Sequence, residues 1–198
     1  MESNVMLQVM VVTDSETHMQ RLSQSVVSSG YALADCALSS GDWSGLVREI
    51  EPDVLLVNAP FLDRKLVEQV ARISEGRALP VAMFTDNSDR GLMVDSLKAG
   101  VTAYVVKGMD TSRVPAVLDL AVARFKELQV LRRELAEARS DLASRKLVER
   151  AKGIVMEQRQ CTEDEAHRML QKTAMDHKKR LVEVAREVIL IAELLTTA

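Results

Sequence analysis

The run Asp53-Val-Leu-Leu-Val-Asn58 decides the fold class, because it is short, almost wholly apolar and bounded by polar residues. A strand that is buried on both faces of a parallel sheet has this pattern. Three further runs repeat it: residues 7–13, 80–85 and 103–107. A helical segment over 18–29 follows the first of these and is predicted to end at Gly30, which tolerates a left-handed conformation after the last turn. We therefore predict a doubly wound α/β domain, with any site at the C-terminal ends of its strands.

The composition is that of a globular protein with an aliphatic core. Of the 198 residues, 47% are apolar and 28% charged, whereas only 3% are aromatic. So few rings argue against single-stranded nucleic acid being bound by stacking on several exposed side chains. The chain has neither a signal-peptide pattern nor an apolar run of membrane-spanning length, so we expect a cytoplasmic protein. Cys36 and Cys161 lie far apart in the sequence, and we expect reduced thiols and no bound metal or cofactor.

Charge is unevenly distributed along the chain. Residues 1–114 contain 10 Lys/Arg and 15 Asp/Glu, whereas residues 115–198 contain 16 and 14. This asymmetry fits an acidic front and a more basic C-terminal end. It is too small to indicate nucleic-acid binding by itself.

Five positions at the predicted strand ends resemble the phosphorylation site of response-regulator receiver domains, and the resemblance covers about residues 5–125. The five positions are Thr13, Asp14, Asn58, Thr85 and Lys107. In the family, the first two are an acidic pair for Mg²⁺, the third is the phosphoacceptor aspartate, and the last two are Thr or Ser and Lys. Here only one member of the acidic pair is acidic, and the acceptor position holds an amide.

The chemistry of Asn58 excludes phosphorylation at that position. An aspartyl phosphate needs a carboxylate nucleophile, which the neutral amide does not supply. The missing acidic residue also weakens a site for Mg²⁺, which prefers anionic oxygen ligands. We therefore predict a protein-binding pseudoreceiver over residues 1–115. Its Asp14, Thr85 and Lys107 are expected to persist as a hydrogen-bonded structural network. Its helices and the surface around Gly108-Met109 are candidate docking sites.

A long helix is predicted to follow, because no Gly or Pro interrupts the chain from Val117 until Gly153. Apolar residues on it have the 4–3 spacing of a coiled coil: Leu128, Leu131, Leu135, Ala138 and Leu142. We predict that residues 116–143 are a coiled-coil linker and that this stripe is the seam of a parallel homodimer, which would present two output modules together. The alternative is a helix that folds back and buries the same leucines against its own receiver-like domain.

Residues 144–198 are predicted to form a compact three-helix bundle. The first helix continues the long one and has apolar residues at helical spacing: Leu147, Val148, Ala151, Ile154 and Val155. Thr162-Glu-Asp-Glu165 is a capping box that begins the second helix. The second helix is expected to bury Ala166, Met169, Leu170, Thr173 and Ala174. The third is expected to bury Leu181, Val184, Ala185, Val188 and Ile189.

Four motifs of this bundle resemble the ANTAR domain of the AmiR/NasT regulators in order and spacing: Glu149–Met156, Thr162–Ala166, Leu170–Met175 and Leu181–Ala185. The resemblance covers about residues 144–190, and the likeness is greatest to the NasT branch of nitrate and nitrite assimilation. It implies a transcription antitermination regulator that binds paired hairpins in nascent leader mRNA. In that branch it also implies control by a periplasmic-binding-protein-like nitrate sensor, which requires no phosphate.

Cations of the bundle are the candidate RNA contacts, because Lys and Arg neutralise phosphates and release counterions. They are Arg145, Lys146, Arg150, Lys152, Arg159, Lys178, Lys179 and Arg180. Each has a simpler interpretation as a solvated residue or, for Arg145, as a coiled-coil position. A DNA-binding response regulator and a protein-binding adaptor stay open as alternatives, although the third helix is poor in base-reading side chains. An enzyme is not expected, because no nucleophile–base pair or metal cluster emerges.

Overall fold

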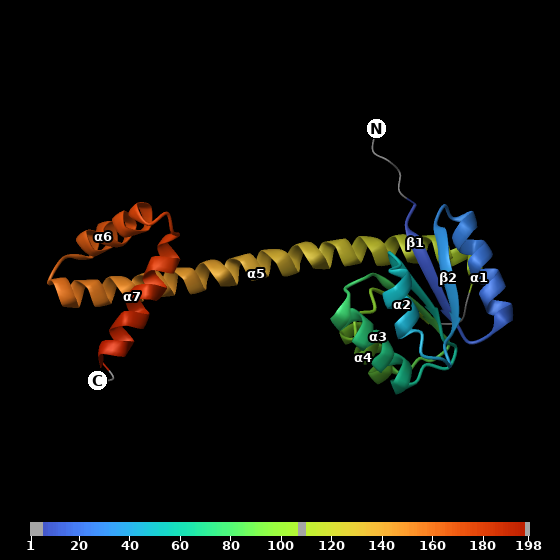
Figure 1. Cartoon of the computed structure of the whole chain (residues 1–198). Coiled ribbons are helices and arrows are strands. Elements are labelled where there is room, and N and C mark those ends of the chain that lie inside the picture. The colour runs from blue at the N-terminus through green and yellow to red at the C-terminus, as the bar shows by residue number, and fades with distance from the viewer. Residues whose placement is uncertain (1–5, 107–109, 197–198) are drawn as a thin grey trace. The chain divides into compact units, whose positions relative to one another are not determined.

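The computed structural model describes residues 6–106 and 110–196 (Figure 1). They form two compact units, Met1–Gln129 and Val130–Ala198. The 46-residue helix α5 (Val114–Arg159) contributes to both, and it continues through Gly153. Within the described residues, no helix is long and apolar enough to cross a membrane.

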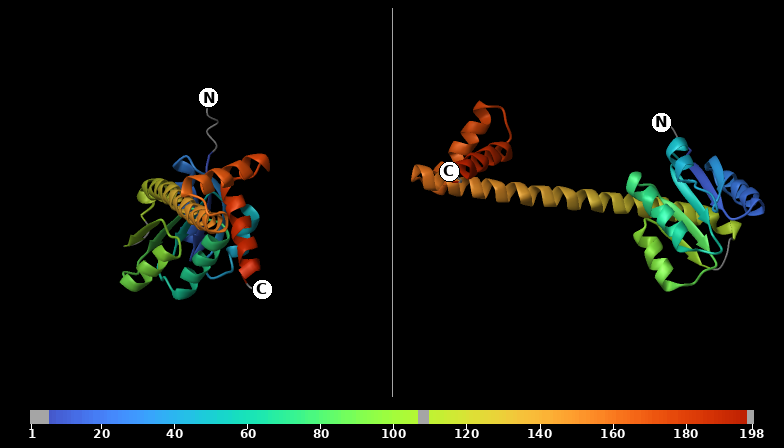
Figure 2. Two further views of the ribbon diagram at one scale, coloured as in Figure 1. Left: turned by 90° about the vertical axis from the view of Figure 1, so that its left-hand side faces the viewer. Right: turned by 60° about the horizontal axis from the view of Figure 1, so that its bottom comes forward.

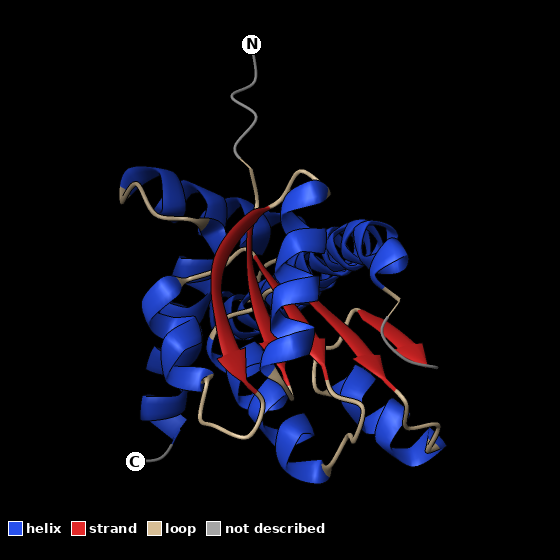
Figure 3. Cartoon of the chain, turned by 90° about the vertical axis from the view of Figure 1, so that its right-hand side faces the viewer, coloured by secondary structure: helices blue, strands red, loops and turns tan. Residues whose placement is uncertain are grey.

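The first unit is built on a five-stranded parallel sheet (Figure 3). Its strands are β1 (Gln8–Thr13), β2 (Ala32–Leu38), β3 (Val54–Asn58), β4 (Val81–Thr85) and β5 (Ala103–Val106). Their order across the sheet is β2-β1-β3-β4-β5. Strands β3 and β4 are buried along their whole length, which explains why their sequences are continuous apolar runs. The predicted doubly wound α/β fold is confirmed.

Helices cover both faces of this sheet. One face carries α1 (Glu16–Ser28) and the start of α5, and the other carries α2 (Ser44–Ile50), α3 (Arg64–Gly76) and α4 (Arg90–Lys98). A short 3-10 turn, η1 (Thr111–Arg113), precedes α5. Phe84 and Leu118 are fully buried between the sheet and the helices α1 and α5. Trp43, Met10 and Met83 are buried between the sheet and the helices α2, α3 and α4. Each face of the sheet therefore has its own aliphatic core, with few aromatic rings.

Two glycines of this unit have backbone conformations that other residues adopt only at a cost. Gly30 has a φ of +81° and follows Ser29, the C-cap residue of α1, which confirms its predicted place at the helix end. Gly100 has a φ of +111°, and a Cβ atom there would lie 2.3 Å from Ser74 Oγ. Side-chain caps begin three of the helices: Ser15 for α1, Asp63 for α3 and Asp89 for α4.

The second unit is the predicted three-helix bundle, formed by the C-terminal part of α5 with α6 (Glu163–Asp176) and α7 (Leu181–Thr196) (Figures 1 and 2). Its buried core is Ala151, Leu170, Ala174, Val184, Ala185 and Ile189. The capping box is present, with Thr162 and Glu165 bonded reciprocally. The expected burial of Met169 and Thr173 is wrong. The buried residues of α6 form a narrow stripe four residues apart, and these two lie beside it in solvent.

Left-handed residues other than glycine join the helices of the bundle. Gln160, with a φ of 49°, follows α5, and Lys178, with a φ of 53°, follows α6. In the second turn, the Lys179 N–H donates to the Ala174 carbonyl at 2.9 Å and the Lys178 N–H to the Met175 carbonyl at 3.1 Å. These bonds satisfy carbonyl groups at the end of α6 and fix the backbone of the turn.

Candidate functional site

Three of the five receiver-like positions lie at the C-terminal ends of neighbouring strands. Thr13 ends β1, Asn58 ends β3 and Thr85 ends β4, and all three are buried. Thr13 and Asn58 are register partners in adjacent strands. Asn58 Nδ2 donates to Thr13 Oγ1 at 3.2 Å, and Thr13 Oγ1 donates to Asp14 Oδ1 at 3.2 Å. The first three predicted site residues therefore form one chain of hydrogen bonds.

His18 on α1 completes this cluster and is absent from the predicted site residues. Its Nδ1 lies 2.8 Å from Asp14 Oδ1 and 3.4 Å from Asn58 Nδ2. Burial acts to raise the pKa of Asp14, but the hydrogen bond and charge of His18, with the hydrogen bond from Thr13, outweigh it and hold the pKa below its ordinary value. Asp14 is therefore an ionised, engaged carboxylate. The spacing of four residues from Asp14 to His18 is the signal that would have identified the histidine.

Thr85 lies outside this chain of hydrogen bonds. Its Oγ1 donates to the Pro60 carbonyl at 3.4 Å and accepts the Asn87 N–H at 3.1 Å. Lys107 lies outside the described residues, as does the Gly108-Met109 surface. We expected Asp14, Thr85 and Lys107 to share one polar network, and the structure does not place Thr85 in a network with Asp14. Asp14 instead belongs to a network with Thr13, Asn58 and His18.

The arrangement places a neutral amide where a receiver needs a nucleophile. Asn58 is only 1% exposed, and its nitrogen is held toward Thr13. An amide in this setting has no carboxylate oxygen with which to attack a phosphoryl donor. In the described part of the chain, no group of three His, Cys, Asp or Glu side chains is placed to hold a metal ion.

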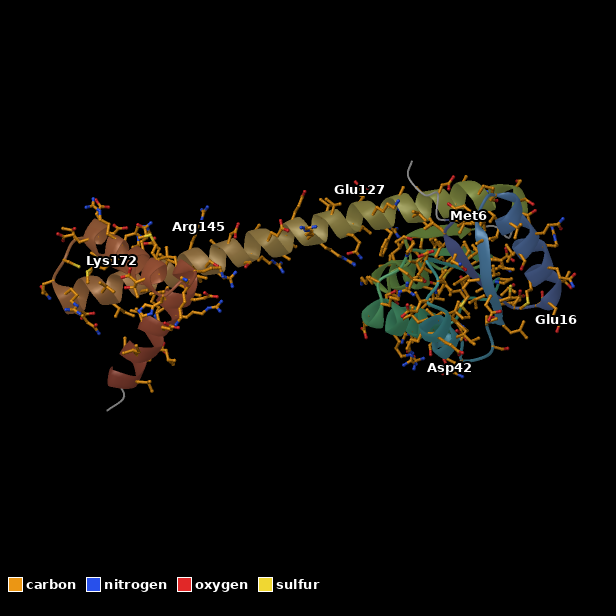
Figure 4. All side chains as sticks on the ribbon, turned by 45° about the horizontal axis from the view of Figure 1, so that its top comes forward. Met6, Glu16, Asp42, Glu127, Arg145 and Lys172 are labelled. Carbon is orange, nitrogen blue, oxygen red and sulfur yellow. The ribbon has the colours of Figure 1, made fainter. Side chains whose placement is uncertain are left out.

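The eight predicted RNA-binding cations of the second unit fall into three groups. Four are exposed and form no ion pair with a described residue: Arg145, Lys146, Arg159 and Lys178. Figure 4 labels Arg145 on α5. Three others are exposed but pair with glutamates of α7: Arg150 with Glu193, Lys179 with Glu187 and Arg180 with Glu183. These three have a structural partner in the bundle, so they are less available to phosphates.

Lys152 forms the third group, because it is only 8% exposed. Its Nζ lies 2.7 Å from Glu149 Oε1 and 2.6 Å from Glu163 Oε1. The hydrogen bonds to Glu149 and Glu163 raise the pKa of the ammonium group. Because Glu163 is the first residue of α6, the pair joins α5 to the start of α6. The geometry gives Lys152 a structural role, while RNA contact by Lys152 stays a prediction.

Two exposed cations of α6 are missing from the predicted set. Arg168 and Lys172 form no ion pair with a described residue, and Figure 4 labels Lys172. They lie four residues apart and therefore share one face of the helix. That spacing is the sequence signal that would have identified them.

The predicted seam is a row of exposed residues on α5. Leu128, Leu131, Leu135 and Leu142 are each between 43% and 57% exposed, and Ala138 is also exposed. None of the five belongs to a hydrophobic core of the described residues. The row is a regularly spaced apolar surface without a partner in those cores.

Comparison with known proteins assigns both units. The ANTAR domain family matches residues 136–189. The transcriptional regulatory protein PdtaR of Mycobacterium tuberculosis is 30% identical over 184 residues, which are 91% of this chain and 90% of PdtaR. The nitrate regulatory protein of Klebsiella oxytoca is 37% identical over 78 residues, 39% of this chain and 20% of that protein. A response regulator from Thermotoga maritima, 21% identical, superimposes with a TM-score of 0.51 over 60% of this chain and 99% of its own.

The three kinds of similarity agree on one class of protein. The ANTAR match covers the core helices of the second unit, and the likeness to PdtaR extends over both units. The solved structure supports the receiver fold of the first unit alone. Proteins of this class are regulatory and not enzymatic, in agreement with the neutral amide at position 58. The chain therefore belongs to the ANTAR-domain response regulators.

Proposed function

We propose that the second unit binds paired hairpins in nascent leader mRNA and thereby stops a downstream terminator from forming. Membership of the ANTAR-domain response regulators supports an RNA-binding regulator of the antitermination type. One observation carries the finer proposal: seven exposed cations of the bundle form no ion pair with a described residue. They are Arg145, Lys146, Arg159, Arg168, Lys172, Lys178 and Arg186. Such groups neutralise phosphates without first breaking an ion pair within the protein.

Binding of the full chain to a labelled two-hairpin leader RNA over a range of salt concentrations tests this proposal. The double variant Arg145→Gln/Lys146→Gln should bind more weakly, and the slope of log affinity against log salt should fall by about 1.4–1.8 for two lost phosphate contacts. The matched control is Arg132→Gln, an exposed arginine of the same helix outside residues 136–189. Wild-type affinity and slope in the double variant would contradict these contacts.

The same assay separates RNA binding from the two alternatives. A DNA-binding regulator would bind duplex DNA at least as tightly as the leader RNA, and a protein-binding adaptor would bind neither. Helix α7 argues against DNA, because Arg186 is its single arginine and it contains no Asn or Gln. Those are the side chains that most often read base edges in the major groove.

We also propose that α5 forms a parallel homodimer through its leucine row. Half-exposed leucines at the 4–3 spacing bury their surface when a second copy of the helix packs against them. Light scattering after size exclusion should give the mass of a dimer for the wild-type chain and of a monomer for Leu131→Asp/Leu135→Asp. The control is Val130→Asp, which changes an equally exposed apolar residue on another face of α5. A monomeric wild-type chain would favour the fold-back alternative.

Regulation by a sensor protein is the third part of the proposal. The buried amide of Asn58 supports control without phosphate. Nitrate or nitrite as the signal is supported by the likeness to the Klebsiella nitrate regulatory protein. Incubation with acetyl phosphate and Mg²⁺ should add no phosphoryl mass to the chain, whereas a stoichiometric adduct would contradict this control. A periplasmic-binding-protein-like sensor should bind the chain and release it when nitrate is added.

A further inference from the structure

A groove between α2 and α3 of the first unit is lined by three arginines. Its volume is about 550 Å³. Arg48 comes from α2, Arg72 from α3 and Arg77 from the residue after α3. The buried side chains of Val47 and Ile73 form an apolar part of the lining. The two helices lie side by side in Figure 1, and Figure 4 labels Asp42, another lining residue.

The three guanidinium groups have not been neutralised by the protein. None of them forms an ion pair with a described residue. Arg77 Nη1 is buried and has no hydrogen-bond acceptor in the described part of the chain. A buried donor without an acceptor is costly, because its hydrogen bonds to water have been lost. The groove therefore offers cationic donors to an acceptor from outside the chain.

The two acidic residues of the lining leave this positive character in place. Asp42 Oδ1 accepts the Ser44 N–H at 3.1 Å and the Ser44 hydroxyl. These hydrogen bonds, and then the charges of Arg72 and Arg48, lower the pKa of Asp42. Glu51, at the end of α2, is exposed and unpaired among the described residues. Three cations face two anions, one of which is already hydrogen-bonded by Ser44.

We propose that this groove binds a small phosphate ester of about nucleotide size. Guanidinium groups bind phosphate oxygens in bidentate geometry, which makes arginine the preferred residue for such ligands. The volume lies within the range of about 300–1,000 Å³ that small-molecule sites occupy, and it exceeds what a lone phosphate needs. Val47 and Ile73 contact the apolar part of the ligand, and the acidic residues accept its hydroxyl groups. This ligand site does not depend on the proposed RNA binding.

Titration calorimetry on the full chain without RNA tests the site, with ADP and inorganic pyrophosphate as probes. Both should bind, and Arg72→Gln/Arg77→Gln should weaken binding by about tenfold or more. Gly76→Phe should exclude ADP by filling the groove while all three arginines remain, since a Cβ on Gly76 meets no atom within 4 Å. The control is Arg64→Gln, at the other end of α3 and outside the lining.

Backbone NMR shifts locate the bound probe. Shifts induced by ADP should cluster on α2 and α3, and shifts confined to residues 144–190 would overturn the proposal. The proposal is also overturned if neither probe binds at about 1 mM or if ADP binding is unchanged in the arginine variant. Citrate is an anion without a phosphate group, and tighter binding of citrate than of both probes would overturn it as well. Circular dichroism checks folding, and Gly76→Phe decides the outcome if the double variant does not fold.

Discussion

Replacing Asn58 by aspartate tests whether the receiver-like site is built around a neutral side chain. Asn58→Asp keeps the shape of the side chain but removes the donor that bonds Thr13 Oγ1 at 3.2 Å. It also places a carboxylate that is nearly fully buried at the end of β3, close to the ionised Asp14. The loss of one hydrogen bond costs about 1 kcal/mol. Burial raises the pKa of the new carboxyl, and a rise of about 2 units adds roughly 2.7 kcal/mol at neutral pH.

The pH dependence distinguishes the two contributions. The folded-state pKa of the new carboxyl lies above its unfolded value of about 4, so the folded chain binds the extra proton between the two values. The cost of charge is therefore absent below about pH 4, grows as the pH rises, and becomes constant above about pH 6. The deficit should be no more than about 1 kcal/mol at pH 4, where the protonated carboxyl is itself a hydrogen-bond donor, and roughly 3–4 kcal/mol at pH 7.

Urea denaturation followed by circular dichroism at several pH values measures this deficit. Asn58→Leu is the matched control, because it removes the same hydrogen bond from a similar volume without adding a charge. Its deficit should not change with pH. If Asn58→Asp has a constant deficit, or is as stable as the wild-type chain at pH 7, then neighbouring groups stabilise an anion there and the neutral-site interpretation is wrong.

Four further substitutions test the local geometry. Gly100→Ala should destabilise the chain by about 2 kcal/mol, because the new Cβ would meet Ser74 at a residue with a positive φ. The control Gly45→Ala in α2 should stabilise the chain by about 0.5 kcal/mol. Denaturation measures both changes, and equal effects would contradict the geometry. Lys178→Gly should stabilise the bundle by about 1 kcal/mol by relieving a φ of 53°, yet weaken RNA binding; unchanged RNA affinity would exclude Lys178 as a contact. Thr162→Ala should cost about 1 kcal/mol, seen as faster amide exchange at the start of α6; unaltered exchange there would show that the capping box contributes little.

Most of the fold follows from periodicity that can be read in the sequence. Strands β1, β3, β4 and β5 appear as apolar runs because both faces of each are covered by helices. Strand β2 is absent from the predicted set, because it lies at the edge of the sheet and alternates half-buried and exposed residues, as at Asp35. The second unit is found from helical spacing and from the capping box.

The candidate sites are harder to derive, because they depend on partners that are distant in sequence. That Lys152 is paired with Glu163 depends on α6 returning along α5, which spacing alone does not give. Lys152 is predicted as an RNA contact because the sequence does not distinguish a buried lysine from an exposed one. The arginine groove cannot be derived from sequence spacing either, because Arg48 and Arg72 lie on different helices and converge only when both helices pack on the sheet.

The scarcity of aromatic residues has a consequence for spectroscopy. The single tryptophan, Trp43, and both tyrosines, Tyr31 and Tyr104, belong to the first unit, and the ANTAR unit contains none. Intrinsic fluorescence of the unlabelled chain therefore reports on the α/β unit alone. Trp43 is buried, but in the sequence it stands between Asp42 and Ser44, which line the arginine groove. We therefore expect its emission to change when a ligand binds there. RNA that binds the ANTAR unit meets no tryptophan or tyrosine of that unit. Ligand binding to the α/β unit can therefore be followed by tryptophan emission while RNA binding is followed by a label on the RNA.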